Sequence, residues 1–161
     1  RSVREGLVRI SEDIHSLAYQ LHPSVLEELG LVEALRAECD RRARQGAMAL
    51  SVALDPLPAA LGKDAAICLF RVAQEALNNV IRHAGASSAS VTLKRMDGGL
   101  LLAVADDGIG FDPKKPGRKR SLGLASMRER VELVNGTLDI ESKPGKGTEI
   151  IAWIPLEGES R

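Results

Sequence analysis

Six apolar residues at the start of the chain recur at spacings of three and four. Charged or polar residues flank these apolar positions. The six apolar residues are Val3, Leu7, Ile10, Ile14, Leu17 and Leu21. This heptad pattern predicts one long helix, whose apolar stripe packs either on its own domain or against a partner helix in a dimeric bundle. His22-Pro23 ends the pattern, because proline lacks a backbone donor and disfavours helix in the preceding residue.

The rest of the chain alternates between helical and strand patterns. Apolar residues at 65, 69, 72, 76 and 80 have helical spacing, whereas residues 47–54 alternate as a strand does. Residues 106–122 show no periodicity and are rich in Gly, Pro, Lys and Arg, which indicates a long loop. We therefore expect helices over 24–44, 61–83 and 123–134, and strands over 47–54, 88–96, 99–105, 137–141 and 148–155.

Composition narrows the class of protein. Of the 161 residues, 44% are apolar and 27% are charged, which indicates a globular protein with a real core. Lys plus Arg and Asp plus Glu both number 22, so no overall field attracts nucleic acid or an anionic membrane. Cys39 and Cys68 lack CxxC spacing, which argues against a zinc site or a disulfide and favours the reducing cytoplasm.

No stretch of the sequence predicts contact with a membrane. The longest apolar run, residues 100–105, is far too short to cross one, and we expect no signal peptide before the domain. The chain starts with Arg1 rather than Met, so we expect a fragment of a longer protein.

Three segments contain candidate chemistry, although each also has an ordinary structural explanation. Glu75, Asn79 and Arg82 share one polar face of the helix over 61–83, with His83 at its edge, as on any amphipathic helix. Asp106 ends an apolar strand beside glycines at 108 and 110, where a carboxylate can accept a hydrogen bond from the adenine amine, or simply form a turn. Residues 144–148 form a glycine turn typical of a hairpin.

Basic residues are concentrated before the helix over 123–134. A mobile basic loop beside a helix N-terminus can close over a triphosphate, although a solvated loop has the same composition. The residues are Lys114, Lys115, Arg118, Lys119 and Arg120.

Taken in order, these segments resemble the motifs of sensor histidine kinases. The N box of that family is similar to QEALNNVIRHA at 74–84, and its three glycine boxes resemble DDGIG at 106–110, LGLASMRER at 122–130 and GKGT at 145–148. The end of the dimerisation domain in the nitrate-sensor-like (NarX/DegS-like) subclass is similar to LHPSVLEELGLVEAL at 21–35. The resemblance covers essentially the whole chain.

The resemblance implies a fold and a division of the chain. The fold is the α/β two-layer sandwich shared with gyrase, heat-shock chaperone ATPases and MutL, in which a mixed sheet of about five strands is covered by three helices. It implies a helical dimerisation segment over 1–45, an ATP-binding catalytic domain over 46–157 and a frayed tail over 158–161.

The resemblance also implies site residues, with ATP and Mg²⁺ as cofactors. Asp106 would hold the adenine amine, Asn79 would bind Mg²⁺ through its amide oxygen, and Glu75 would act as a base or polarise the attacking group. Arg82 and His83 would lie along the phosphates and sugar. The family motif further implies pocket-shaping positions at Gly108, Gly110, Gly123, Leu124 and Gly147, and Thr148 would support Asp106 through water.

One feature of the family is missing. The phosphoacceptor histidine is followed by an acidic residue, whereas His15 precedes Ser16 and His22 precedes Pro23. We therefore expect a cytoplasmic histidine kinase fragment that binds ATP but does not phosphorylate itself, with a response regulator and a second copy as partners in the full-length protein. The alternatives are a serine kinase of the anti-sigma type and a non-catalytic, nucleotide-gated dimerisation module.

Overall fold

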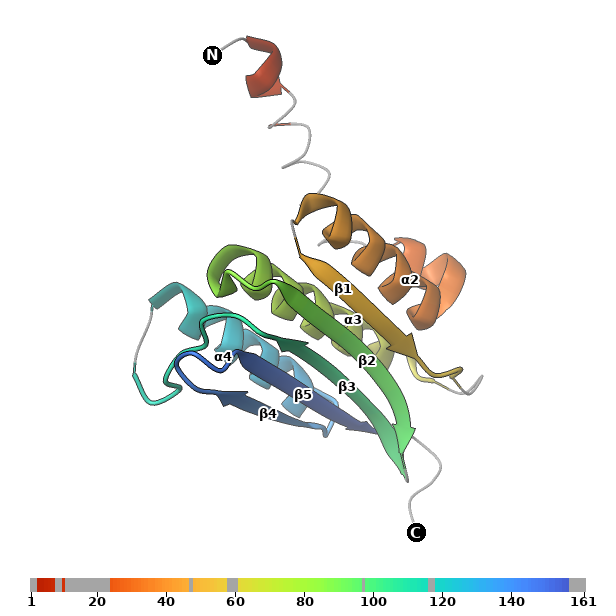
Figure 1. Ribbon diagram of the computed structural model, residues 1–161. Helices are drawn as coiled ribbons and strands as arrows, with labels where there is room; N and C mark the ends of the chain where they lie inside the picture. The colour runs from red at the N-terminus through yellow and green to blue at the C-terminus, as the bar shows by residue number, and fades with distance from the viewer. Residues whose placement is uncertain are drawn as a thin grey trace.

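Five strands form one mixed sheet in the order β1-β2-β3-β5-β4 (Figure 1). The computed structural model describes residues 3–7, 10, 24–46, 48–57, 61–96, 98–115 and 118–156. β1 runs parallel to β2, and the other neighbouring pairs are antiparallel. The strands are β1 Ala49–Leu54, β2 Ser88–Met96, β3 Gly99–Asp106, β4 Thr137–Ser142 and β5 Thr148–Pro155.

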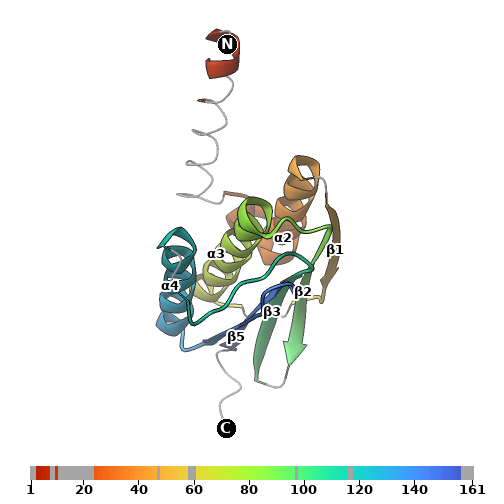
Figure 2. The ribbon, with the colours of Figure 1, turned by 60° about the vertical axis from the view of Figure 1, so that its left-hand side comes forward.

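Three helices cover one face of this sheet (Figure 2). They are α2 Ser24–Gln45, α3 Lys63–Asn79 and α4 Arg118–Leu133, and the π-helix η1 Val80–Ala84 continues α3. Alternate residues of β3, such as Leu100, Leu102 and Val104, are buried beneath the helices because side chains of a strand point to opposite faces in turn. The expected two-layer fold, a mixed five-stranded sheet covered by helices, is confirmed.

Helix α2 contributes to the same core as the sheet. Leu31, Ala34 and Leu35 are buried within the main hydrophobic cluster, together with residues of α3 and the strands. The helix kinks at Gly30, where φ is 83° and ψ is 174°. Helix α2, which we grouped with the dimerisation region, therefore contributes buried side chains to the core of the domain.

Two elements differ from the sequence-based prediction by more than two residues. The loop over 106–122 was predicted too long, because the helix expected at residue 123 begins at Arg118. Arg, Lys and Leu are good helix formers, so this stretch is helical without apolar periodicity. The last turn of the helix over 61–83 forms η1, and a π turn has no signature in the apolar pattern.

The described part of the heptad region is helical and exposed. Residues 3–7 and 10 are helical, with Val3, Leu7 and Ile10 between 56% and 81% exposed. The remaining heptad positions, His15, His22 and the expected tail over 158–161 lie outside the described residues.

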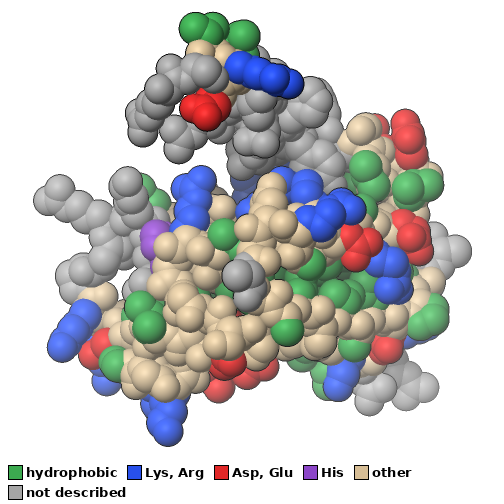
Figure 3. All heavy atoms as spheres, turned by 45° about the horizontal axis from the view of Figure 1, so that its top comes forward, with side chains coloured by type: hydrophobic (Ala, Val, Ile, Leu, Met, Phe, Trp, Pro, Cys, Tyr) green, Lys and Arg blue, Asp and Glu red, His purple; other side chains and the backbone are tan. Residues whose placement is uncertain are grey.

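In the described ranges no helix is both long and apolar enough to cross a membrane. Both signs of charge are interspersed on the face shown in Figure 3.

Candidate functional site

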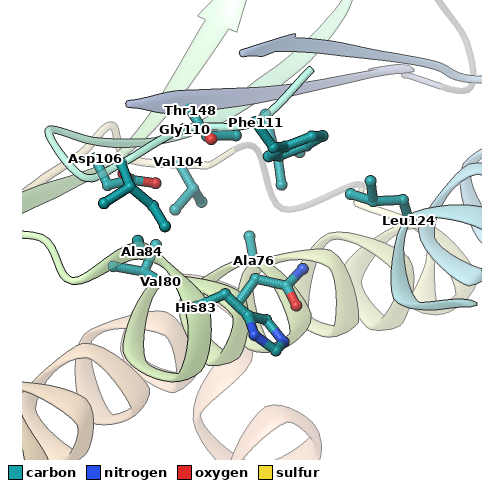
Figure 4. A pocket seen from close by; sticks show the side chains of 13 residues that line it. Ala76, Val80, His83, Ala84, Val104, Asp106, Gly110, Phe111, Leu124 and Thr148 are labelled. Atoms are coloured by element: carbon teal, nitrogen blue, oxygen red, sulfur yellow. The ribbon is translucent and has the colours of Figure 1, made fainter. Parts of the chain in front are cut away.

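A pocket of about 430 Å³, including its opening to solvent, lies between the helices and one end of the sheet. Five segments that are distant in sequence meet there: α3 with η1, the end of β3, the loop after it, α4 and the start of β5 (Figure 4). Its apolar lining comprises Ala76, Val80, Ala84, Val104, Ile109, Phe111, Leu124 and Ile150. An apolar cleft with a few convergent polar groups is typical of a small-molecule site.

Asp106 is the last residue of β3 and lines the pocket. It continues the inward alternation of Leu102 and Val104, and its Oδ1 accepts a 2.8 Å hydrogen bond from the Gly108 N–H. Burial raises the pKa of Asp106, against the lowering effect of hydrogen bonds from the backbone of Gly108 and Thr148. An ionised carboxylate has about four lone-pair positions, so it can still accept from a ligand.

Asp107 has a different role from its neighbour. Its Oδ1 accepts from the N–H groups of Ser87 and Ser88 at 2.8 and 2.9 Å, and its Oδ2 accepts from Ser88 Oγ at 2.9 Å. Hydrogen bonds from the Ser88 backbone and hydroxyl lower the pKa of Asp107. This carboxylate fastens the end of β3 to the start of β2 and does not line the pocket.

The two polar residues of η1 differ in whether they line the pocket. On an ideal α-helix both Arg82 and His83 would share a face with Asn79, at i+3 and i+4, but the wider turn of a π-helix moves position i+3 away from that face. His83 lines the pocket with Asn79, whereas Arg82 is exposed. Figure 4 shows His83 on the helix side, opposite Asp106 and Thr148 on the sheet side.

Asn79 has an unsatisfied group at the pocket. Its Nδ2 is buried and lacks a hydrogen-bond partner among the described residues. The amide nitrogen and oxygen exchange places by a half-turn of the side chain, so Asn79 can present either a donor or a carbonyl oxygen. A single neutral oxygen suits Mg²⁺, which keeps several waters and takes its other ligands from phosphates.

Two glycines allow backbone segments at the rim of the pocket to approach each other closely. A side chain at Gly108 would overlap the Ala84 carbonyl, to which the next residue, Ile109, donates a 2.8 Å hydrogen bond. A side chain at Gly147, where φ is 75°, would overlap the carbonyl oxygen of Asp106. These contacts fix the loop after β3 and the turn before β5 against their neighbours.

The structure brings six of the eleven expected site residues into the pocket lining. These are Asn79, His83, Asp106, Gly110, Leu124 and Thr148. The other five lie outside that lining, and they are Glu75, Arg82, Gly108, Gly123 and Gly147. Glu75 instead lies against Gly123 of α4.

Most of the apolar lining was not predicted as part of the site. Ile109 and Phe111 interleave with the glycines after Asp106, which is the signal that could have identified them. Val80 and Ile150 read only as core positions of a helix and a strand. No group of three or more His, Cys, Asp or Glu side chains able to hold a metal occurs in the described part of the chain.

The motif order and this pocket agree with a comparison against known families. The sequence profile of the histidine kinase-, DNA gyrase B- and HSP90-like ATPases matches residues 64–158. The chain belongs to this ATPase family. The elements that line the pocket, from α3 to β5, lie within the matched range except for the first residue of α3.

Individual relatives are sensor histidine kinases. The chain is 39% identical over 153 residues to the sensor histidine kinase MctS of Rhizobium johnstonii, and 36% identical over 155 residues to NarS of Mycobacterium tuberculosis. Each match covers 94% of this chain, but the chain spans only 33% and 36% of the length of those relatives. The likeness to NarS agrees with the nitrate-sensor-like subclass.

A solved structure supports the same fold. The histidine kinase domain of the blue-light activated kinase EL346 from Erythrobacter litoralis superposes with a TM-score of 0.63 at 26% identity. The match covers 81% of this chain and 61% of that one. This ATPase-family chain is therefore similar to sensor histidine kinases in both sequence and fold.

Proposed function

We propose that this chain is the ATP-binding catalytic part of a two-component sensor histidine kinase. The observation that carries the proposal is the pocket itself, in which Asp106 of β3 and Asn79 of α3 line one apolar cleft. The Asp106 carboxylate would accept from the adenine amine, whereas the carbonyl oxygen of guanine would oppose it. The apolar side chains would bury the base.

The polar face of α3 and η1 would bind the phosphates. Asn79 would hold Mg²⁺ through its amide oxygen, and His83 would lie along the sugar and phosphates. Bound Mg²⁺ would neutralise phosphate charge. Glu75 would polarise the attacking imidazole. We assign Arg82 a peripheral role, because its side chain is exposed on η1 and does not line the pocket.

The γ-phosphate would pass to a histidine that is not in this chain. Of its three histidines, His83 lines the pocket, and neither His15 nor His22 is followed by an acidic residue. In the full-length protein the acceptor would lie on an upstream dimerisation helix of a homodimer, from which a response regulator would take the phosphate. We place this reaction in the cytoplasm, without nucleic-acid or membrane contact by the chain.

Calorimetric titration tests nucleotide binding. We expect Mg²⁺-dependent binding of ATP and ADP, with dissociation constants from micromolar to millimolar, and weaker binding of GTP. Asn79→Ala should chiefly remove the Mg²⁺ dependence, and Asn78→Ala is the matched control because its side chain does not line the pocket. Equal affinity for ATP and GTP in the parent would contradict the assignment of Asp106.

Labelling with radioactive ATP tests the transfer. The chain alone should remain unlabelled, and it should label a longer partner that carries the upstream helix and the inactivating Asn79→Ala change. The label should be acid-labile, as phosphohistidine is. An acid-stable label would favour the serine kinase, and no label on either protein would favour a nucleotide-gated module.

A further inference from the structure

Ser142, the last residue of β4, lies in one row with two residues of the pocket. In the strand register Ser142 is opposite Thr148 of β5, and Thr148 is opposite Asp106 of β3. Thr148 and Asp106 both line the pocket, whereas Ser142 lies behind them. Any hydrogen bond that Ser142 makes to Thr148 therefore acts on the pocket from outside.

The Ser142 hydroxyl makes three short contacts. It accepts a 2.9 Å hydrogen bond from the N–H of Phe111, and it donates to the carbonyl oxygen of Gly147 at 3.1 Å. Its third contact is with Thr148 Oγ1, at 2.8 Å. These three partners belong to the loop after β3, the turn before β5, and β5 itself.

Only one arrangement of the hydroxyl protons satisfies all three contacts. A serine hydroxyl has one proton and two acceptor positions. Its proton goes to Gly147, so the contact with Thr148 requires Thr148 to donate. Thr148 thereby commits its only proton to Ser142, and its oxygen presents lone pairs towards the pocket.

We infer that Ser142 is a positioning residue that sets the nucleotide preference of the pocket through the Thr148 hydroxyl. With its proton held by Ser142, Thr148 is an acceptor beside the acceptor carboxylate of Asp106. This wall of the pocket then favours ligand groups that donate, such as the exocyclic amine of adenine or a water bound to it. A ligand carbonyl at the same place meets lone pairs only.

The Phe111 contact gives Ser142 a second means of control. Phe111 and Gly110 lie beside Thr148 in the pocket (Figure 4). The same loop is also held by the N–H of Gly145, which donates to the Ile109 carbonyl at 2.6 Å. Loss of the Ser142 hydroxyl therefore removes one of the hydrogen bonds that hold this loop and frees the Thr148 proton.

The inference rests on the proposed adenine nucleotide site, and it is tested with a pair of ligands that differ at one edge of the base. Inosine triphosphate has a carbonyl oxygen where ATP has its amine, and its neighbouring ring nitrogen N1 carries a proton. We expect Ser142→Ala to reduce the ratio of ATP affinity to inosine triphosphate affinity by about three- to tenfold, the effect of one hydrogen bond. Ser142→Thr, which keeps the hydroxyl, should retain the parental ratio.

If Ser142 had a purely structural role, its substitution would lower the affinities for both nucleotides by the same factor. An unchanged ratio in Ser142→Ala, even with lower affinities, would therefore overturn the inference and leave the proposed function intact. A parent chain that binds no ATP would overturn both. If Ser142→Ala does not fold, Ser142→Cys carries the same test, because a thiol is a weak acceptor and also frees the Thr148 proton.

Discussion

The carboxylate of Glu75 lies directly against Gly123 on the neighbouring helix α4, so close that a methyl group on that glycine would overlap Glu75 Oε1. The contact connects the helix that carries Asn79 to the helix that begins at Arg118. It also explains why Glu75 is near the pocket without lining it. The position of this carboxylate therefore depends on α4.

Gly123→Ala should slow phosphate transfer while leaving the stability of the fold almost unchanged. The obstructing atom is the end of a flexible side chain, and alanine favours a helix interior by about 0.5–1 kcal/mol, so the free energy of unfolding should change by no more than about 1 kcal/mol. Displacement of Glu75 should slow labelling of a histidine-bearing partner by about tenfold or more. Ser126→Ala, at an exposed position of α4, is the control. Full transfer activity in Gly123→Ala would remove Glu75 from the mechanism.

Asp106→Asn should stabilise the protein while weakening ATP binding. Burial raises the pKa of Asp106, so the ionised form opposes folding at neutral pH. The variant should therefore have the higher free energy of unfolding at pH 7. The advantage should shrink as the pH falls through the raised pKa towards the ordinary value near 4, where the parent carboxyl is also neutral.

Urea unfolding of both proteins at several pH values measures this difference, and titration with ATP measures the loss of affinity. The amide oxygen of the variant can still accept from the Gly108 N–H. Its NH₂ group would then face the adenine amine, donor against donor. A parent that is more stable than Asp106→Asn at pH 7 would contradict the role of burial.

Asp107→Ala should show the opposite pH dependence. Hydrogen bonds from Ser88 lower the pKa of Asp107, so its ionised form stabilises the fold. The variant should be less stable than the parent at pH 7, and the deficit should disappear as the pH falls below the ordinary carboxyl pKa and through the lowered one. Asp107→Asn, which keeps an acceptor, should lose less stability. A deficit that persists unchanged in acid would assign the effect to packing.

Leu35→Ala tests whether α2 is part of the domain core. Leu35 is fully buried in the main cluster, so its truncation should cost about 2–5 kcal/mol of unfolding free energy. Leu29→Ala is the matched control on the same helix, because Leu29 is 63% exposed, and it should change stability by less than about 0.5 kcal/mol. Equal effects of the two substitutions would show that α2 does not contribute to the core.

Periodicity predicted the elements well where one face is buried. The five strands and α3 carry alternating or helical apolar patterns, since the core selects side chains at those spacings. The turns upstream of Gly123 were missed because they present no apolar face, and η1 was missed because a widened turn changes the backbone without changing the pattern. Helix α2 was grouped with its sequence neighbours, since the sequence alone does not reveal that Leu35 is buried in the same core as α3 and the strands.

Site residues could be predicted from the sequence where the side chain itself indicates a chemical role. Asp106 and Asn79 were singled out as a carboxylate and an amide in recognisable motifs, and the structure places both at one pocket. Ser142 was not singled out, because its importance comes from the strand register that sets it opposite Thr148. The register depends on pairing between distant strands, which single-sequence patterns do not determine.

The pairing of Asp106 with Thr148 also has a kinetic consequence. The hairpins β2–β3 and β4–β5 are local and can form within about 1–10 μs, but β3 and β5 meet only after the chain that includes α4 has closed between them. Such loop closure is slow, because its entropy is lost before the contacts are gained. A nucleotide finds no pocket before that step, so it should lower the unfolding rate in stopped-flow experiments and leave the folding rate unchanged.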